Sequence, residues 1–79
     1  MDVEKKIEKC KKIDCLTLDL RNQKLRKLPK SIEKLDHLEK LSLINNNLIE
    51  LPQSLGELKS LKSLHLFNNK IIKLPKSIG

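Results

Sequence analysis

Residues 38–60, LEKLSLINNNLIELPQSLGELKS, recur along most of this 79-residue chain at a fixed spacing. The period is the distance from Leu38 to Leu61, and advancing by it also superposes Leu41/Leu64, Leu43/Leu66, Asn46/Asn69, Leu51/Leu74 and Pro52/Pro75. Moving back by one period places Leu18, Leu20, Leu25, Leu28 and Pro29 under Leu41, Leu43, Leu48, Leu51 and Pro52. A fixed period of this size is the sequence signature of a repeat architecture, in which similar coils stack and share a core.

The spacing L-x-x-L-x-L-x-x-N-x-L resembles the leucine-rich repeat family. It is complete over residues 38–48 and again over residues 61–71, where Ile71 takes the last place. The following L-P-x-x-[IL]-G-x-L segment narrows the resemblance to the 23-residue intracellular type, known from Ras-pathway scaffold proteins and multi-copy bacterial proteins. The resemblance implies an α/β fold, a short solenoid with a parallel β-sheet on its concave face.

Two regions are expected along the chain. Residues 1–14 place Val3, Ile7 and Cys10 on one helical stripe among charged residues, which predicts a capping helix over the first coil. Residues 15–79 hold three coils, 15–37, 38–60 and an incomplete 61–79. Each coil should contain one short strand, around residues 16–20, 40–43 and 63–66, with its leucines directed inward.

The family also implies a ladder of buried side-chain amides, one per coil, at Gln23, Asn46 and Asn69. Gln23 stands where the other coils have asparagine, and Cys15 stands where they have leucine. Both departures mark the first coil as a terminal repeat. At the other end the third coil stops at Gly79. An uncapped C-terminal edge of this kind favours self-association, because an open strand edge can pair with another chain.

Charge alone gives little support to nucleic-acid binding. The net charge is +7, which attracts polyanions on electrostatic grounds. However, the recurring lysines do not form a continuous track, and Phe67 is the only aromatic residue. Binding to single-stranded nucleic acid usually requires both a basic groove and stacking rings. A solvated lysine-rich edge is therefore the favoured interpretation.

The two cysteines, Cys10 and Cys15, are predicted to be reduced thiols. They are too few for the cysteine-rich cap that secreted members of the resembled family carry. The segment from Met1 to Asp14 contains no apolar run of signal-peptide length, and no stretch of the chain approaches transmembrane length. A cytoplasmic location without a membrane partner is the resulting expectation.

Catalysis finds no support in the sequence. His37 and His65 are separated by more than one period and thus fall in different parts of the repeat. No nucleophile is placed beside a base, and no glycine-rich phosphate loop or metal-ligand spacing is present. We expect no enzyme activity, no cofactor, no metal and no small-molecule substrate.

The candidate site lies between the inward leucines, where residues of successive coils align on the concave face. A protein partner of unknown identity should bind there, as the resemblance implies, through Asp19, Arg21, Lys40, Ser42, Ile44, His65 and Phe67. Ile44 and Phe67 beside Arg21 have the composition of an interface hot spot, although the two apolar side chains could instead only pack on each other. The neighbouring Asn22, Asn45 and Asn68 are expected to shape the turn after each strand.

These features predict a non-enzymatic protein-interaction module. The alternative is the N-terminal part of a longer leucine-rich repeat scaffold with a mainly structural, capping role. A third hypothesis, binding of a polyanion or nucleic acid through the lysine-rich edge, is the least favoured.

Overall fold

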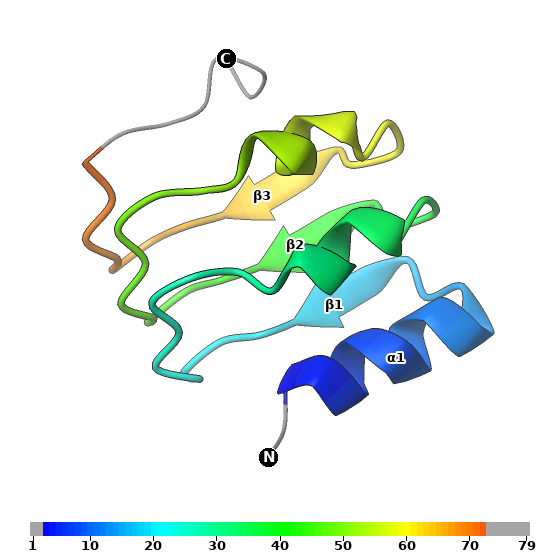
Figure 1. Ribbon diagram of the computed structural model, residues 1–79, viewed down its shortest axis with the longest axis horizontal. Coiled ribbons are helices and arrows are strands. Elements are labelled where there is room, and N and C mark those ends of the chain that lie inside the picture. Colours follow the sequence, from blue (N-terminus) through cyan, green and yellow to red (C-terminus); the bar gives the residue numbers. More distant parts are fainter. Residues whose placement is uncertain (1–2, 73–79) are drawn as a thin grey trace.

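The computed structural model describes residues 3–72, in which one α-helix, three strands and two 3-10 helices follow one another in three coils (Figure 1). The elements are α1 (Val3–Ile13), β1 (Thr17–Asp19), η1 (Lys30–Lys34), β2 (Lys40–Ser42), η2 (Gln53–Glu57) and β3 (Ser63–His65). In Figure 1 the strands lie side by side, α1 lies next to β1, and the two 3-10 helices stack beside each other along one side of the sheet.

The sheet is parallel with strand order β1-β2-β3, and its register reproduces the sequence period. Leu18 pairs with Leu41, and Leu41 pairs with Leu64. Each strand is shorter than the sequence predicts, because the chain turns soon after it. The turn contains Asn22, Asn45 or Asn68, each with φ near +60°, a left-handed conformation that asparagine tolerates better than most residues. The structure therefore supports the predicted role of these asparagines in shaping the turns.

The core is aliphatic and is most completely covered in the second coil. Leu38, Leu41, Leu43 and Leu48 are fully buried, with 0% of their surface exposed. Their counterparts in the third coil are only partly buried: Leu61, Leu64, Leu66 and Ile71. The difference follows from stacking, since the second coil has a neighbour on both sides and the third is flanked only by the second among the described residues.

The helix α1 covers the other end of the stack. Ile7 and Cys10 are buried against the first coil, and Val3 packs beside them. Two polar contacts fix the helix in place: the Ser31 hydroxyl donates to the Glu4 carboxylate over 2.5 Å, and Lys6 Nζ donates to the Asp19 carbonyl over 3.1 Å.

The cysteines differ from the sequence prediction. Cys10 and Cys15 form a disulfide, so the prediction of two reduced thiols is wrong. The chain turns back at Asp14, which has a φ of 50°, and this brings the two Cα atoms to 4.9 Å from each other. That separation falls within the range that a disulfide requires. The prediction of a cytoplasmic location rested in part on reduced cysteines, and it stays a prediction.

Prolines open the return segments as expected, since Pro29 and Pro52 directly precede η1 and η2. Each 3-10 helix buries one aliphatic side chain, Ile32 or Leu55, under the sheet. The corresponding positions of the third coil, including Leu74, Pro75, Ile78 and Gly79, lie outside the described residues.

Candidate protein-binding face

One face of the sheet is polar, because alternate strand residues point away from the leucine core. We call it the strand face; it consists of the outward residues of the three strands and those that directly follow them. The pairing register aligns Thr17 with Lys40 and Ser63, and aligns Asp19 with Ser42 and His65. Side chains that are one repeat period apart in sequence thus become direct neighbours on this face.

The strand face carries a shallow hollow of about 360 Å³. It is lined by Thr17, Asp19, Arg21, Lys40, Ser42, Ile44 and His65. Six of the seven residues predicted to bind a partner therefore lie around one depression. Thr17 is an additional lining residue that the sequence prediction did not include, although its place in the Thr17/Lys40/Ser63 column could have identified it.

Phe67 does not line this hollow. It follows β3 after Leu66, and 78% of its surface is exposed. Ile44, one period earlier, is only partly exposed. Since most of the surface of Phe67 is exposed, Ile44 and the other described side chains cover only a small part of this residue.

The strongest electrostatic interaction of the strand face joins Asp19 and Arg21. Arg21 Nε donates to Asp19 Oδ1 over 2.9 Å and Nη2 donates to Oδ2 over 2.9 Å, a bidentate arrangement. The Arg21 backbone N–H also donates to Oδ1 over 3.0 Å. These hydrogen bonds from Arg21 lower the pKa of Asp19, and Lys6 adds a smaller effect in the same direction. The Asp19 carboxylate in turn raises the pKa of Arg21.

The remaining polar residues of the hollow have different surroundings. Ser42 lies on the central strand and is nearly buried, with 8% of its surface exposed. Lys40 is exposed and has no ion-pair partner among residues 3–72. Because Asp19 offsets Arg21, Lys40 is the formal charge of the hollow that a partner can neutralise.

A second column of exposed aliphatic residues was missed by the sequence prediction. Ile49 is 48% exposed and Ile72 is 85% exposed. The two residues lie one period apart and therefore occupy equivalent places in successive coils. The sequence did contain a sign of this column, because an isoleucine directly follows the last leucine-type residue of the motif in two successive coils, after Leu48 and after Ile71. The first coil has Arg26 at this place, so the column is confined to the second and third coils.

The predicted amide ladder lies behind the turns and has a structural role in this geometry. Asn46 is 5% exposed; its Oδ1 accepts from the Gln23 N–H and its Nδ2 donates to the Leu20 carbonyl. Asn69 makes the equivalent contact one coil later, donating to the Leu43 carbonyl over 2.8 Å. Gln23 directs its own side-chain amide to the Arg21 carbonyl instead, over 3.0 Å.

Within the described part of the chain, the two histidines lie in different places. His37 lies beside Asp14, at 3.9 Å and exposed, next to the C-terminal end of α1, whereas His65 lies on β3. Among residues 3–72 no three His, Cys, Asp or Glu side chains are placed to hold a metal ion. Over the same residues, no helix has both the length and the apolar character needed to cross a bilayer.

Comparison with models of known protein families gives a match. The model of a family described as "Leucine rich repeat" matches residues 17–71, which include all three strands and all seven predicted partner-binding residues. A comparison with curated proteins gives no match.

Proposed function

Since this chain belongs to the leucine-rich repeat family, we propose that it is a protein-interaction module that binds its partner on the strand face. Domains of this family generally bind other proteins and are typically not enzymes. The proposal identifies the strand face with the concave face of a short solenoid. It also assigns the chain to the 23-residue type, on the strength of the Leu-Pro pairs at Leu28–Pro29 and Leu51–Pro52.

One observation carries this proposal: the shared hollow formed by residues from all three strands. Its rim combines a bidentate ion pair, Asp19–Arg21, with the uncompensated charge of Lys40. A partner that contributes a carboxylate to Lys40 and an apolar side chain to Ile44 would complement it. Phe67, exposed beside the hollow, supplies the aromatic surface that interfaces often use as an anchor.

The test is a capture experiment followed by an affinity measurement. Proteins retained by the wild-type chain but not by Phe67→Ala are identified by mass spectrometry, and each is then titrated against the purified variants. Ile44→Ala and Phe67→Ala should each weaken binding at least about tenfold, as expected for hot-spot residues. Ile72→Ala is the matched control, because Ile72 is exposed but outside the strand face. Equal affinities for wild type, Ile44→Ala and Phe67→Ala would refute the site assignment.

The structural alternative is favoured by a specific observation, the incompletely buried third coil. Leu61, Leu64, Leu66 and Ile71 retain surface that their counterparts bury. In this alternative the chain is the N-terminal part of a longer scaffold or associates with a second chain through the β3 edge. The proposal of a protein-interaction module also includes a cytoplasmic location, whereas the structural alternative does not depend on location. Binding of a polyanion through the lysine-rich edge would instead require an affinity that falls steeply with salt.

A further inference from the structure

We propose that the strand face binds an extended acidic peptide segment of its partner. One carboxylate of the segment binds at Ser42 and Lys40, and an apolar side chain two residues away in the peptide packs on Ile44. This inference rests on the proposed function and adds to it the chemical class and the spacing of the bound groups. It is carried by the Ser42 hydroxyl, which is open to a ligand although the residue is nearly buried.

Ser42 lies on the central strand and lines the hollow of the strand face, with only 8% of its surface exposed. Within the described part of the chain, its hydroxyl makes no hydrogen bond. Over the same residues, every fully enclosed side-chain nitrogen or oxygen has a partner, so the Ser42 hydroxyl is not fully enclosed and reaches the hollow. A nearly buried polar group usually has a hydrogen-bond partner, and this one is available to donate to a bound acceptor.

The charges around Ser42 favour an anionic acceptor. Lys40 lines the same hollow two residues earlier on β2, is exposed, and has no ion-pair partner among residues 3–72. Asp19, the neighbour of Ser42 on β1, does not cancel this charge, because both of its carboxylate oxygens accept hydrogen bonds from Arg21. A carboxylate that accepts from the Ser42 hydroxyl and the Lys40 ammonium would make two charge-assisted hydrogen bonds, which are stronger than neutral ones.

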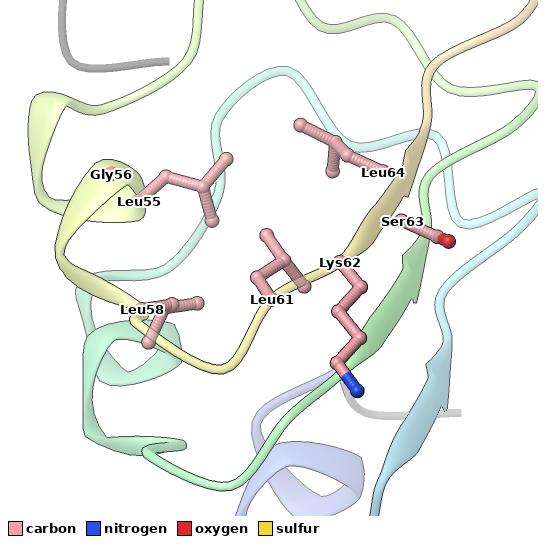
Figure 2. Close-up of a pocket in the computed structure, with 7 residues that line it drawn as sticks. All are labelled: Leu55, Gly56, Leu58, Leu61, Lys62, Ser63 and Leu64. Atoms are coloured by element: carbon pink, nitrogen blue, oxygen red, sulfur yellow. The ribbon is translucent and has the colours of Figure 1, made fainter.

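A second hollow, of about 240 Å³ at the outer side of β3, has a different lining. Leucines form most of it, and Figure 2 shows the side chains of Leu55 and Leu58 directed toward that of Leu61. Its serine, Ser63, is exposed, and in Figure 2 the Ser63 side chain is directed away from these leucines. The register places Ser63 on the strand face one strand away from Ser42. Ser63 is therefore the matched control for Ser42: the same hydroxyl on the same face, but outside the strand-face hollow.

Ile44 supplies an apolar part of the strand-face hollow, two residues after Ser42. The backbone still follows the sheet there, because the Asn45 N–H donates to the Phe67 carbonyl over 3.0 Å. Two residues of extended chain span about 6.6 Å and direct their side chains to the same face. Side chains i and i+2 of an extended peptide have the same spacing. An acidic and an apolar residue separated by one residue therefore match Ser42 and Ile44.

The experiment is a nuclear magnetic resonance titration of the ¹⁵N-labelled 79-residue chain with acetylated, amidated peptides. The reference peptide is Ser-Glu-Thr-Leu-Thr-Ser; one variant replaces its glutamate by glutamine and another replaces its leucine by alanine. The glutamate peptide should bind about tenfold more tightly than the glutamine peptide, as expected when a charged hydrogen-bond acceptor is lost. The largest shifts should fall on the backbone amides of residues 40–44.

Variants of the chain then locate the carboxylate. Ser42→Ala and Lys40→Gln should each weaken the glutamate peptide by about tenfold and change the affinity for the glutamine peptide by less than about twofold, since the substitutions in chain and peptide remove the same interaction. Ile44→Ala should abolish the preference for the leucine peptide over the alanine peptide. Ser63→Ala should leave every affinity unchanged, and the spectrum of each free variant verifies that it is folded.

Three results would overturn the inference: equal affinities for the glutamate and glutamine peptides, equal losses in Ser42→Ala and Ser63→Ala, or displacement of the peptide by an equal concentration of sodium acetate. The last result would assign the site to a free carboxylate instead of a peptide. A captured protein partner distinguishes this inference from the proposed function. A partner that requires Phe67 but binds Ser42→Ala and Lys40→Gln as tightly as wild type would refute the carboxylate site and leave the strand face as the binding surface.

Discussion

Replacing Asn46 by alanine should lower the unfolding free energy by about 4 kcal/mol, since this one amide serves backbone groups of two coils. Its Oδ1 accepts hydrogen bonds from the N–H groups of Gln23 and Leu25, over 3.0 and 3.1 Å. Its Nδ2 donates to the carbonyls of Leu20 and Leu43, both over 2.9 Å. The two bonds that Nδ2 donates are buried, so solvent does not readily replace them after truncation.

The magnitude follows from what each partner retains. The Leu43 carbonyl still accepts from Asn69 Nδ2 over 2.8 Å, so it loses little. The Leu20 carbonyl is left as a buried acceptor, at a cost of about 1–3 kcal/mol. The two N–H groups belong to partly buried bonds that water can reach, and each loses only the net value of a hydrogen bond, about 0.5–1.5 kcal/mol.

Asn69→Ala is the matched control in the third coil. Asn69 is only partly buried, and it donates to the Leu43 and Leu66 carbonyls while accepting from the Leu48 N–H. Because the Leu43 carbonyl keeps Asn46 and the other groups lie nearer to solvent, we expect a loss of about 1–2 kcal/mol.

The assay is urea unfolding followed by far-UV circular dichroism. A core of this size supplies about 3–5 kcal/mol, so Asn46→Ala would lie close to its unfolding midpoint in plain buffer. A fixed concentration of sucrose, which favours burial, raises the stability of wild type and both variants, so that all three urea transitions can be measured under the same conditions. The reasoning would be refuted if Asn46→Ala cost less than about 1 kcal/mol, or if Asn69→Ala cost as much as Asn46→Ala.

Two further predictions concern the first coil and the helix that covers it. Because hydrogen bonds from Arg21 hold the pKa of Asp19 below its unfolded value, the pair should stabilise the fold above the unfolded pKa and lose that effect as pH falls through the folded pKa. Both side chains are about half exposed, so the effect on the free energy of unfolding should stay under about 1 kcal/mol. In a plot of melting temperature against pH, Asp19→Asn should flatten the acidic part of the curve. A profile identical to that of the wild type would contradict this expectation. The Cys10–Cys15 disulfide closes a short loop, with a sequence separation of 5, which the chain-entropy relation values at about 2 kcal/mol. Reductant should lower the urea midpoint of wild type but not of Cys10→Ala/Cys15→Ala, and a wild type insensitive to reductant would show that the bond does not stabilise the fold.

The repeat period was sufficient to predict the core and the strand register. An apolar side chain that is buried between two coils packs against the equivalent positions of its neighbours, so Leu18, Leu41 and Leu64 were expected to align. The ends of the strands were less predictable. They depend on the left-handed turn that contains Asn22, Asn45 or Asn68, and period-two alternation carries no information about where the backbone leaves the sheet.

The candidate site was predictable only in part, for a similar reason. Alternation placed Asp19, Lys40 and His65 on one face, and the structure adds that they share a hollow. Phe67 comes shortly after the end of β3, so alternation along the strand could not decide its distance from that hollow. The disulfide depends on a backbone reversal at Asp14, and the spacing of the two cysteines does not by itself reveal a reversal.

The two ends of the described stack differ in how completely their apolar side chains are covered. At the N-terminal end, α1 buries Ile7 and Cys10 and leaves the strand face open. At the other end, Leu64 is exposed in part although Leu41, its neighbour in the sheet, is not. Apolar surface and an unpaired strand edge favour pairing with another chain whatever its sequence. Among the described residues, the edge of β3 is therefore the end of the stack where association with a further strand is most favoured.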